Sequence, residues 1–170
     1  MNKKINEIVT LLKKSWDTMD AKSLRITQDL IKGLDLESID KSQGVTSEGI
    51  ELYRDKEQGF ILIAYRETQD TYRIPHNHGN GWVIYSVLEG EVEMGNYFNW
   101  QKTADRSQLI LKDKVILKKG DVQIYYPGDI HDTKCLSENA LIIRLTSCDL
   151  SVEEAAGRMK RFEVKKSCSL

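Results

Sequence analysis

The sequence predicts an all-β core, an antiparallel barrel or jelly roll, preceded by a helical N-terminal extension. Residues 1–43 place apolar side chains at helical spacing. From residue 44 to residue 150, about nine or ten short apolar segments are separated by turn residues, and no helical pattern lies between them. The 170 residues suffice for one well-buried domain, and no repeat or low-complexity linker divides them.

The N-terminal extension, residues 1–43, is expected to form two helices that pack on the barrel. A break is expected near Asp17–Asp20, and the second helix should run from about Ala21 to Leu34. The first helix has one apolar stripe, formed by Ile5, Ile8, Leu11 and Leu12.

The barrel, residues 44–150, is expected to consist of short strands bounded by Gly, Pro, Asn or Asp. Phe60–Tyr65 reads FILIAY, a nearly continuous apolar run that is typical of a buried strand. Gln108–Lys112 and Val115–Leu117 are expected as two strands joined by a Lys–Asp turn. The other expected strands are Ile50–Tyr53, Thr71–Ile74, Trp82–Leu88, Glu91–Phe98, Val122–Tyr126, Asp132–Leu136 and Ala140–Leu145.

Residues 151–170 are expected to form a C-terminal helix or tail. Ser151 and Glu154 match a capping box, which predicts a short helix to about Met159. Residues 161–170 are either a final edge strand or a loose end.

Composition argues against several classes of partner. A formal charge of -1 and a pI near 6.3 give no general attraction to nucleic acid or to anionic lipid. No apolar run approaches the roughly 20 residues that a membrane-spanning helix needs, and the N-terminal lysines are not followed by a signal-peptide core. The 3 cysteines have no CxxC spacing, which favours a reduced, cytoplasmic compartment.

The 3 histidines of the chain predict a metal site. His76 and His78 are two residues apart, so in an extended strand both imidazoles lie on one face. His131 ends a second segment punctuated by Gly and Pro. If the two segments are neighbouring strands, all three side chains converge, and neutral imidazole is the commonest metal ligand in proteins.

The spacing around these histidines resembles the two sequence motifs of the cupin superfamily. The first motif, G-x5-H-x-H-x3,4-E-x6-G, is matched at His76, His78 and Gly90. The second, G-x5-P-x-G-x2-H-x3-N, is matched at Gly120 and His131. The resemblance implies that residues 44–150 form the double-stranded β-helix of a cupin barrel.

Three departures from the cupin motifs carry information. The glutamate of the first motif is replaced by Val83, which removes the carboxylate ligand. In the second motif, Tyr126 takes the place of the first proline, with Pro127 displaced by one residue, and Cys135 replaces the terminal asparagine. The expected metal ligands are therefore three uncharged imidazoles.

The segment Phe60–Leu150 is similar to the cysteine dioxygenase group of cupins, in which three histidines hold a ferrous iron. That resemblance implies oxidation of a small thiol by O₂ to a sulfinic acid. The ligand set agrees with such a substrate, because three imidazoles leave the full charge on Fe(2+). A thiolate and a second anionic group can then bind without making a dry interior negative.

The resemblance implies that an arginine binds the anionic group of the substrate, and two arginines are candidates. Arg54 precedes the apolar strand that leads to the histidine pair, where the family places its carboxylate-binding arginine. The Ser-His-Tyr set of the family is replaced by Ile142, Arg144 and Thr146, so Arg144 is the second candidate for the anion ligand. Tyr85 is in phase with Val83, and its hydroxyl is the candidate catalytic hydrogen-bond donor.

Two other functions fit the same histidines. A zinc ion held by three histidines could activate water for hydrolysis, although no Asp or Glu near His76 and His78 offers a base. A small-molecule-binding cupin without turnover is the other alternative. The expected partners of the enzyme are a thiol and O₂, and the resemblance also allows a homodimer through pairing of edge strands.

Overall fold

The computed structural model describes residues 2–39, 44–102 and 107–163. Two helices precede the strands and one follows them: α1 (Lys3–Ser15), α2 (Ala21–Lys32) and α3 (Leu150–Ala155). Two short 3₁₀ segments are η1 (Trp16–Thr18) and η2 (Leu36–Ser38). The strands are β1 (Ile50–Arg54), β2 (Ile61–Thr68), β3 (Tyr72–His76), β4 (Val83–Glu89), β5 (Glu91–Lys102), β6 (Ser107–Lys118), β7 (Val122–Tyr125), β8 (Ile130–Cys135) and β9 (Asn139–Thr146).

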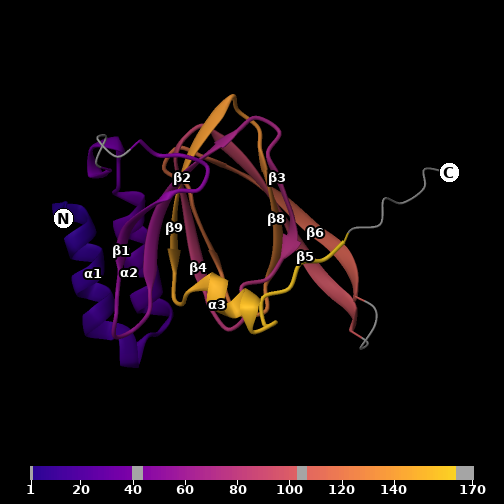
Figure 1. The fold of residues 1–170 in the computed structure, drawn as a ribbon, viewed down its shortest axis with the longest axis horizontal. Coiled ribbons are helices and arrows are strands. Elements are labelled where there is room, and N and C mark those ends of the chain that lie inside the picture. The colour runs from indigo at the N-terminus through magenta and orange to yellow at the C-terminus, as the bar shows by residue number, and fades with distance from the viewer. Residues whose placement is uncertain (1, 40–43, 103–106, 164–170) are drawn as a thin grey trace.

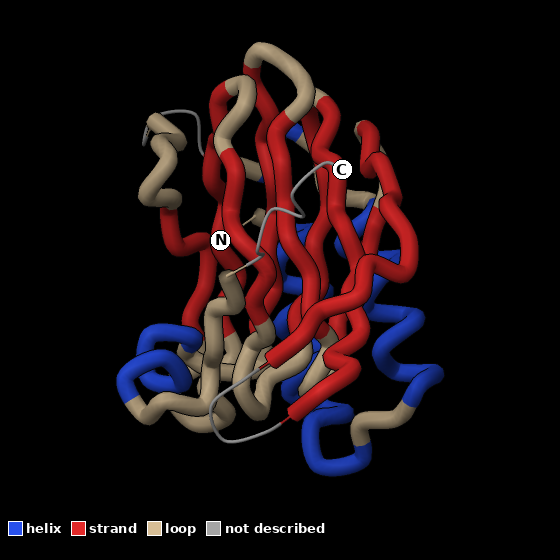
Figure 2. The backbone as a smooth tube through the Cα atoms, turned by 90° about the vertical axis from the view of Figure 1, so that its right-hand side faces the viewer, coloured by secondary structure: helices blue, strands red, loops and turns tan. Residues whose placement is uncertain are grey.

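The strands form two antiparallel sheets that face each other, as expected for a jelly roll. One sheet has the order β1-β2-β9-β4-β7 and the other the order β3-β8-β5-β6. The two helices α1 and α2 cover the outer face of the five-stranded sheet (Figure 1). Figure 2 shows the four-stranded sheet toward the viewer, with no helix across it. The all-β core with a helical N-terminal extension is confirmed.

Polar caps and apolar stripes explain the two N-terminal helices. The side chain of Asn2 accepts a hydrogen bond from the backbone N–H of Lys4, and Asp20 accepts one from that of Ser23 at 2.7 Å. Both side chains satisfy a donor that a helix N-terminus leaves without an intrahelical partner. The break between the helices, expected near residues 17–20, is occupied by η1. No helix among the described residues is long and apolar enough to span a membrane.

Strand alternation divides the apolar side chains between two cores. The first core lies between the outer face of the five-stranded sheet and the helices. It contains Leu62, Ile84 and Ile143 of the sheet, together with Leu12 and Ile31 of the helices. The second core lies between the sheets and consists of Tyr65, Val83, Tyr85, Val87, Val92, Met94, Leu117, Tyr125, Cys135, Ala140 and Ile142. Because alternate residues of β2, β4 and β9 face opposite sides, these strands are buried on both faces.

Two local expectations were wrong. Residues 107–118 form one strand, β6, instead of two strands with a Lys–Asp turn, because β5 pairs along its whole length and absorbs the Lys–Asp step in a bulge. The capping box at Ser151 does not form either. Asp149 caps α3 by accepting from the N–H of Ser151 at 2.9 Å, and the helix ends at Ala155. Residues 164–170 lie outside the described part of the chain.

Candidate metal centre

The three histidines meet between the two sheets. His76 ends β3 and is the cross-strand partner of His131 on β8, while His78 lies in the loop that follows β3. One ring nitrogen from each residue lies within 4.8 Å of the others. All three side chains are buried, His78 and His131 completely. The hypothesis that two distant segments bring the histidines together is therefore correct.

Burial keeps the three imidazoles uncharged. Loss of hydration lowers the pKa of His76, and it lowers that of His131 well below its usual value. The pKa of His78 falls to about 3, first because of burial and then because of repulsion by His76 and Arg144. A neutral imidazole offers a lone pair, so these shifts favour metal binding over protonation at neutral pH.

The nitrogens that converge fit a metal ion. The Nδ1–H of His76 donates to the carbonyl of Ile74 at 2.8 Å, which leaves its Nε2 as the free ligand atom. The Nε2 atoms of His78 and His131 lie 3.2 Å apart. Two nitrogens bound at about 2.1 Å to one ion, roughly 100° apart, have a similar separation. Among the described residues, no carboxylate or thiol belongs to this group of ligands.

Two tyrosines line the histidine cluster. The hydroxyl of Tyr85 lies 3.2 Å from Nε2 of His78, and burial raises the pKa of this tyrosine, which therefore stays protonated. The ring of Tyr125 stacks on that of His131, with 3.9 Å between centroids, and so restricts its rotation. Val83, at the glutamate position of the first motif, is fully buried beside them.

The two candidate arginines lie in different surroundings. Arg54 is bound at the surface by Glu51 at 2.8 Å and by Asp149 at 2.6 Å, so its charge is already balanced. Arg144 extends from β9 to within 5.8 Å of the centroid of the Tyr65 ring in the inner core. Its Nε is buried without a hydrogen-bond partner, and no ion pair forms with it in the described part of the chain. The role of each in substrate binding stays a prediction.

Sequence reasoning missed a second charged group beside Tyr65. Arg73 lies 5.6 Å from the centroid of the Tyr65 ring, and its Nε donates to Glu67 at 2.5 Å. Glu67 is almost completely buried, and its second carboxylate oxygen has no partner. Side chains of β2 alternate between its two faces, which places Ile63, Tyr65 and Glu67 on one face. This alternation is the signal from which the position of Glu67 beside Tyr65 could have been predicted.

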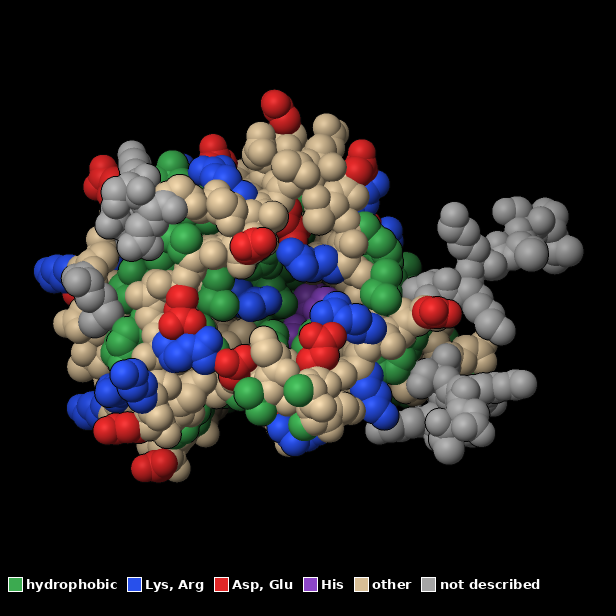
Figure 3. Space-filling view, in the orientation of Figure 1, with side chains coloured by type: hydrophobic (Ala, Val, Ile, Leu, Met, Phe, Trp, Pro, Cys, Tyr) green, Lys and Arg blue, Asp and Glu red, His purple; other side chains and the backbone are tan. Residues whose placement is uncertain are grey.

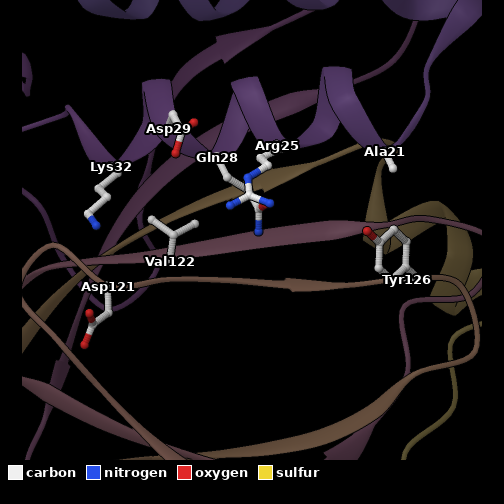
Figure 4. Close-up of a pocket in the computed structure, with 8 residues that line it drawn as sticks. All are labelled: Ala21, Arg25, Gln28, Asp29, Lys32, Asp121, Val122 and Tyr126. Carbon is white, nitrogen blue, oxygen red and sulfur yellow. The ribbon is translucent and has the colours of Figure 1, made fainter.

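The histidines lie at the bottom of a hollow. Figure 3 shows their side chains in purple, surrounded by blue Lys and Arg side chains. A separate groove of about 440 Å³ lies between α2 and β7, where Arg25, Asp121 and Tyr126 are among the lining residues (Figure 4). That groove is on the helix-covered side of the five-stranded sheet and contains none of the histidines.

Fold and site together define a jelly-roll barrel with a buried three-histidine cluster. No family model and no curated protein sequence matches this chain. Solved structures that resemble it in fold include a cupin domain and a protein with a double-stranded β-helix domain. KdgF from Halomonas sp. is 16% identical with a TM-score of 0.46, and the match covers 58% of this chain and 74% of that one.

Two further structures have a similar degree of likeness. The cupin domain of Cnp3 from Schizosaccharomyces pombe is 12% identical with a TM-score of 0.48, over 65% of this chain and 66% of that one. Hydroquinone 1,2-dioxygenase PnpCD, in complex with Cd2+ and 4-hydroxybenzonitrile, is 13% identical with a TM-score of 0.46, over 61% and 65%. This chain thus spans just under two thirds of the last two structures, and the likeness concerns the fold alone.

Proposed function

We propose that this protein is a non-haem Fe(2+) thiol dioxygenase that oxidises a small anionic thiol, cysteine or a similar compound, to its sulfinic acid with O₂. The observation that carries the proposal is the pairing of an uncharged ligand set with an interior arginine. His76, His78 and His131 neutralise none of the charge of a divalent ion, and Arg144 adds a further positive charge without an ion-pair partner among the described residues. Such an interior favours a ligand with two negative groups.

Each group of the chain has a separate task in the proposed reaction. When bound, ferrous iron would supply the redox chemistry between the thiol and O₂. The guanidinium of Arg144 binds the carboxylate of the substrate through two parallel hydrogen bonds and fixes its orientation. Once Nε2 of His78 is engaged as a ligand, the hydroxyl of Tyr85 is left to donate a hydrogen bond to the substrate. The apolar side chains of the inner core exclude water.

The proposal is tested by measuring O₂ consumption of the ferrous-loaded protein with cysteine, 3-mercaptopropionate and cysteamine. Thiol-dependent uptake with formation of the sulfinic acid, identified by mass spectrometry, supports the proposal. Uptake that persists in His76→Ala would refute it, because a metal-centred reaction cannot survive loss of a ligand. Zinc in the purified protein, with no uptake after iron loading, would indicate hydrolysis instead.

A further inference from the structure

The chain beyond α3 returns to the segment that carries the first two histidines. The N–H of Phe162 donates to the carbonyl of Pro75 at 2.8 Å, and the N–H of Asn77 donates to the carbonyl of Lys160 at 3.1 Å. Arg161 forms an antiparallel bridge with His76 between these two contacts. Residues 160–162 thus extend the sheet edge beside His76, and the chain after α3 passes the end of β3 (Figure 1).

A buried carboxylate of α3 binds the loop that follows His78. One oxygen of Glu153 accepts a hydrogen bond from the backbone N–H of Asn80 at 2.9 Å. Arg158 donates to both oxygens of the same carboxylate, at 2.9 and 2.7 Å. These hydrogen bonds lower the pKa of Glu153 to about 2, so the carboxylate is ionised at neutral pH. The loop is therefore held by a carboxylate that does not belong to the three-histidine cluster.

The loop has a glycine, Gly79, where the carboxylate of Glu153 approaches its backbone. Gly79 has a φ of 62°, a left-handed conformation that is strained for other residues, and a Cβ at this position would collide with the carboxylate of Glu153. The side chain of Asn77 adds a second tie, since its oxygen accepts from the N–H of Lys160 at 2.8 Å. Backbone and side chains on both sides of His78 are thus held by the C-terminal segment.

We propose that Glu153 is a positioning residue of the metal centre, which holds the 77–80 loop so that His78 meets His76 and His131. His76 and His131 are fixed by cross-strand pairing, whereas His78 lies beyond the end of β3. Its position therefore depends on contacts of the loop. The inference rests on the metal-binding part of the proposed function and is independent of thiol oxidation.

The test compares Glu153→Ala and Glu153→Gln with Glu89→Ala as the control. Glu89 is exposed at the end of β4, is likewise paired with an arginine, Arg66 at 2.9 Å, and belongs neither to the 77–80 loop nor to the C-terminal segment. Co²⁺ affinity is measured by titration of metal-free, folded protein through its visible absorption. Glu153→Ala should weaken Co²⁺ binding about 10-fold, the lower end of the effect of lost outer contacts at metal sites. Glu153→Gln keeps an acceptor for the N–H of Asn80 and should bind Co²⁺ more tightly than Glu153→Ala, while Glu89→Ala should match the wild type.

Hydrogen exchange gives a readout without metal. In the metal-free protein, the amides of residues 77–80 should exchange faster in Glu153→Ala than in wild type, with unchanged exchange in β4 and β9. Wild-type Co²⁺ affinity and unchanged exchange of this loop in Glu153→Ala would overturn the inference, as would a wild-type protein that binds no metal. Normal Co²⁺ binding that is weakened in Glu153→Ala, without any thiol oxidation, would refute the dioxygenase and leave the positioning role intact.

Discussion

Tyr85 and Arg144 are direct cross-strand partners on β4 and β9, and both side chains reach into the space between the sheets. The hydroxyl of Tyr85 lies 3.2 Å from Nε2 of His78, so this pair links the arginine to the histidine cluster. An anion bound by Arg144 would therefore lie on the side of the barrel interior that Tyr85 shares with the histidine cluster. This relationship gives a physical basis for preferring Arg144 to Arg54 as the substrate ligand.

Replacing Arg144 by Gln should therefore lower activity selectively. A hydrogen-bonded charge pair contributes about 1.5–3 kcal/mol, so kcat/KM for cysteine or 3-mercaptopropionate should fall roughly 10- to 150-fold. Cysteamine has no carboxylate, and its kcat/KM should change little. Arg66→Gln is the matched control, because Arg66 is paired with Glu89 at the surface of the same sheet. Equal losses with all three thiols would mean that Arg144 acts only on the structure.

The metal-free protein should lose stability below pH 6.5. The pKa values of the three histidines are lowered in the folded state, to about 3 for His78, whereas the unfolded chain has an ordinary value near 6.5. The stabilisation is thus complete above pH 6.5 and is lost as pH falls from 6.5 toward 3, because only the unfolded chain takes up protons there.

Urea unfolding between pH 7.5 and pH 4.5 measures this dependence. Each histidine can contribute up to about 1.4 kcal/mol per pH unit to the slope of the unfolding free energy. His78→Gln should reduce the slope by the share of one histidine. A free energy of unfolding that stays constant between pH 7 and pH 5 in the wild type would contradict the lowered pKa values.

Introducing a carboxylate at position 83 should make the thermal stability of the protein depend more strongly on bound metal. Val83 is fully buried in the core that contains Tyr85 and Tyr125, the two tyrosines beside the histidines, so Val83→Glu places an unpaired acid in the interior and should destabilise the metal-free protein. Added Co²⁺ should then raise the melting temperature of Val83→Glu more than that of wild type, because the carboxylate becomes a fourth ligand. Val87→Glu, on the same face of β4 but farther along the strand, is the control. An equal response of both variants to Co²⁺ would rule out a ligand position at residue 83.

Local sequence pattern was sufficient to predict most of the fold and the histidine cluster. Predicting that His76, His78 and His131 converge required only strand periodicity and the assumption that their segments are neighbours. The pairing of β3 with β8 satisfies that assumption. The same periodicity placed Arg144 in phase with the interior. Contacts between distant segments have no such local signal. The hydrogen bond from the N–H of Asn80 to Glu153 joins residues 73 positions apart. Neither the residue types nor their spacing in the sequence predicts this hydrogen bond.

The error at β6 has a related cause. Lys112 and Asp113 have the composition of a turn, yet strand pairing overrides local preference where a long partner strand supplies hydrogen bonds on one side. Asp113 accepts from the side chain of Asn96 at 2.5 Å, and Lys114 pairs with Glu93 at 2.7 Å. Cross-strand polar contacts of this kind stabilise a continuous strand that the sequence alone divides into two.

The N-terminal helices should be required for the stability of the barrel, because their side chains complete the outer core. Leu12 of α1 is fully buried in a cluster with Leu62 and Ile143 of the five-stranded sheet. Leu12→Ala should lower the free energy of unfolding by about 2–5 kcal/mol, the usual cost of removing a buried leucine side chain. Leu11 is only partly buried at the preceding position and has the same helix propensity, so Leu11→Ala should cost about 1 kcal/mol or less. Urea unfolding followed by circular dichroism measures both. A loss in Leu12→Ala no larger than that in Leu11→Ala would contradict the contribution of α1 to the core.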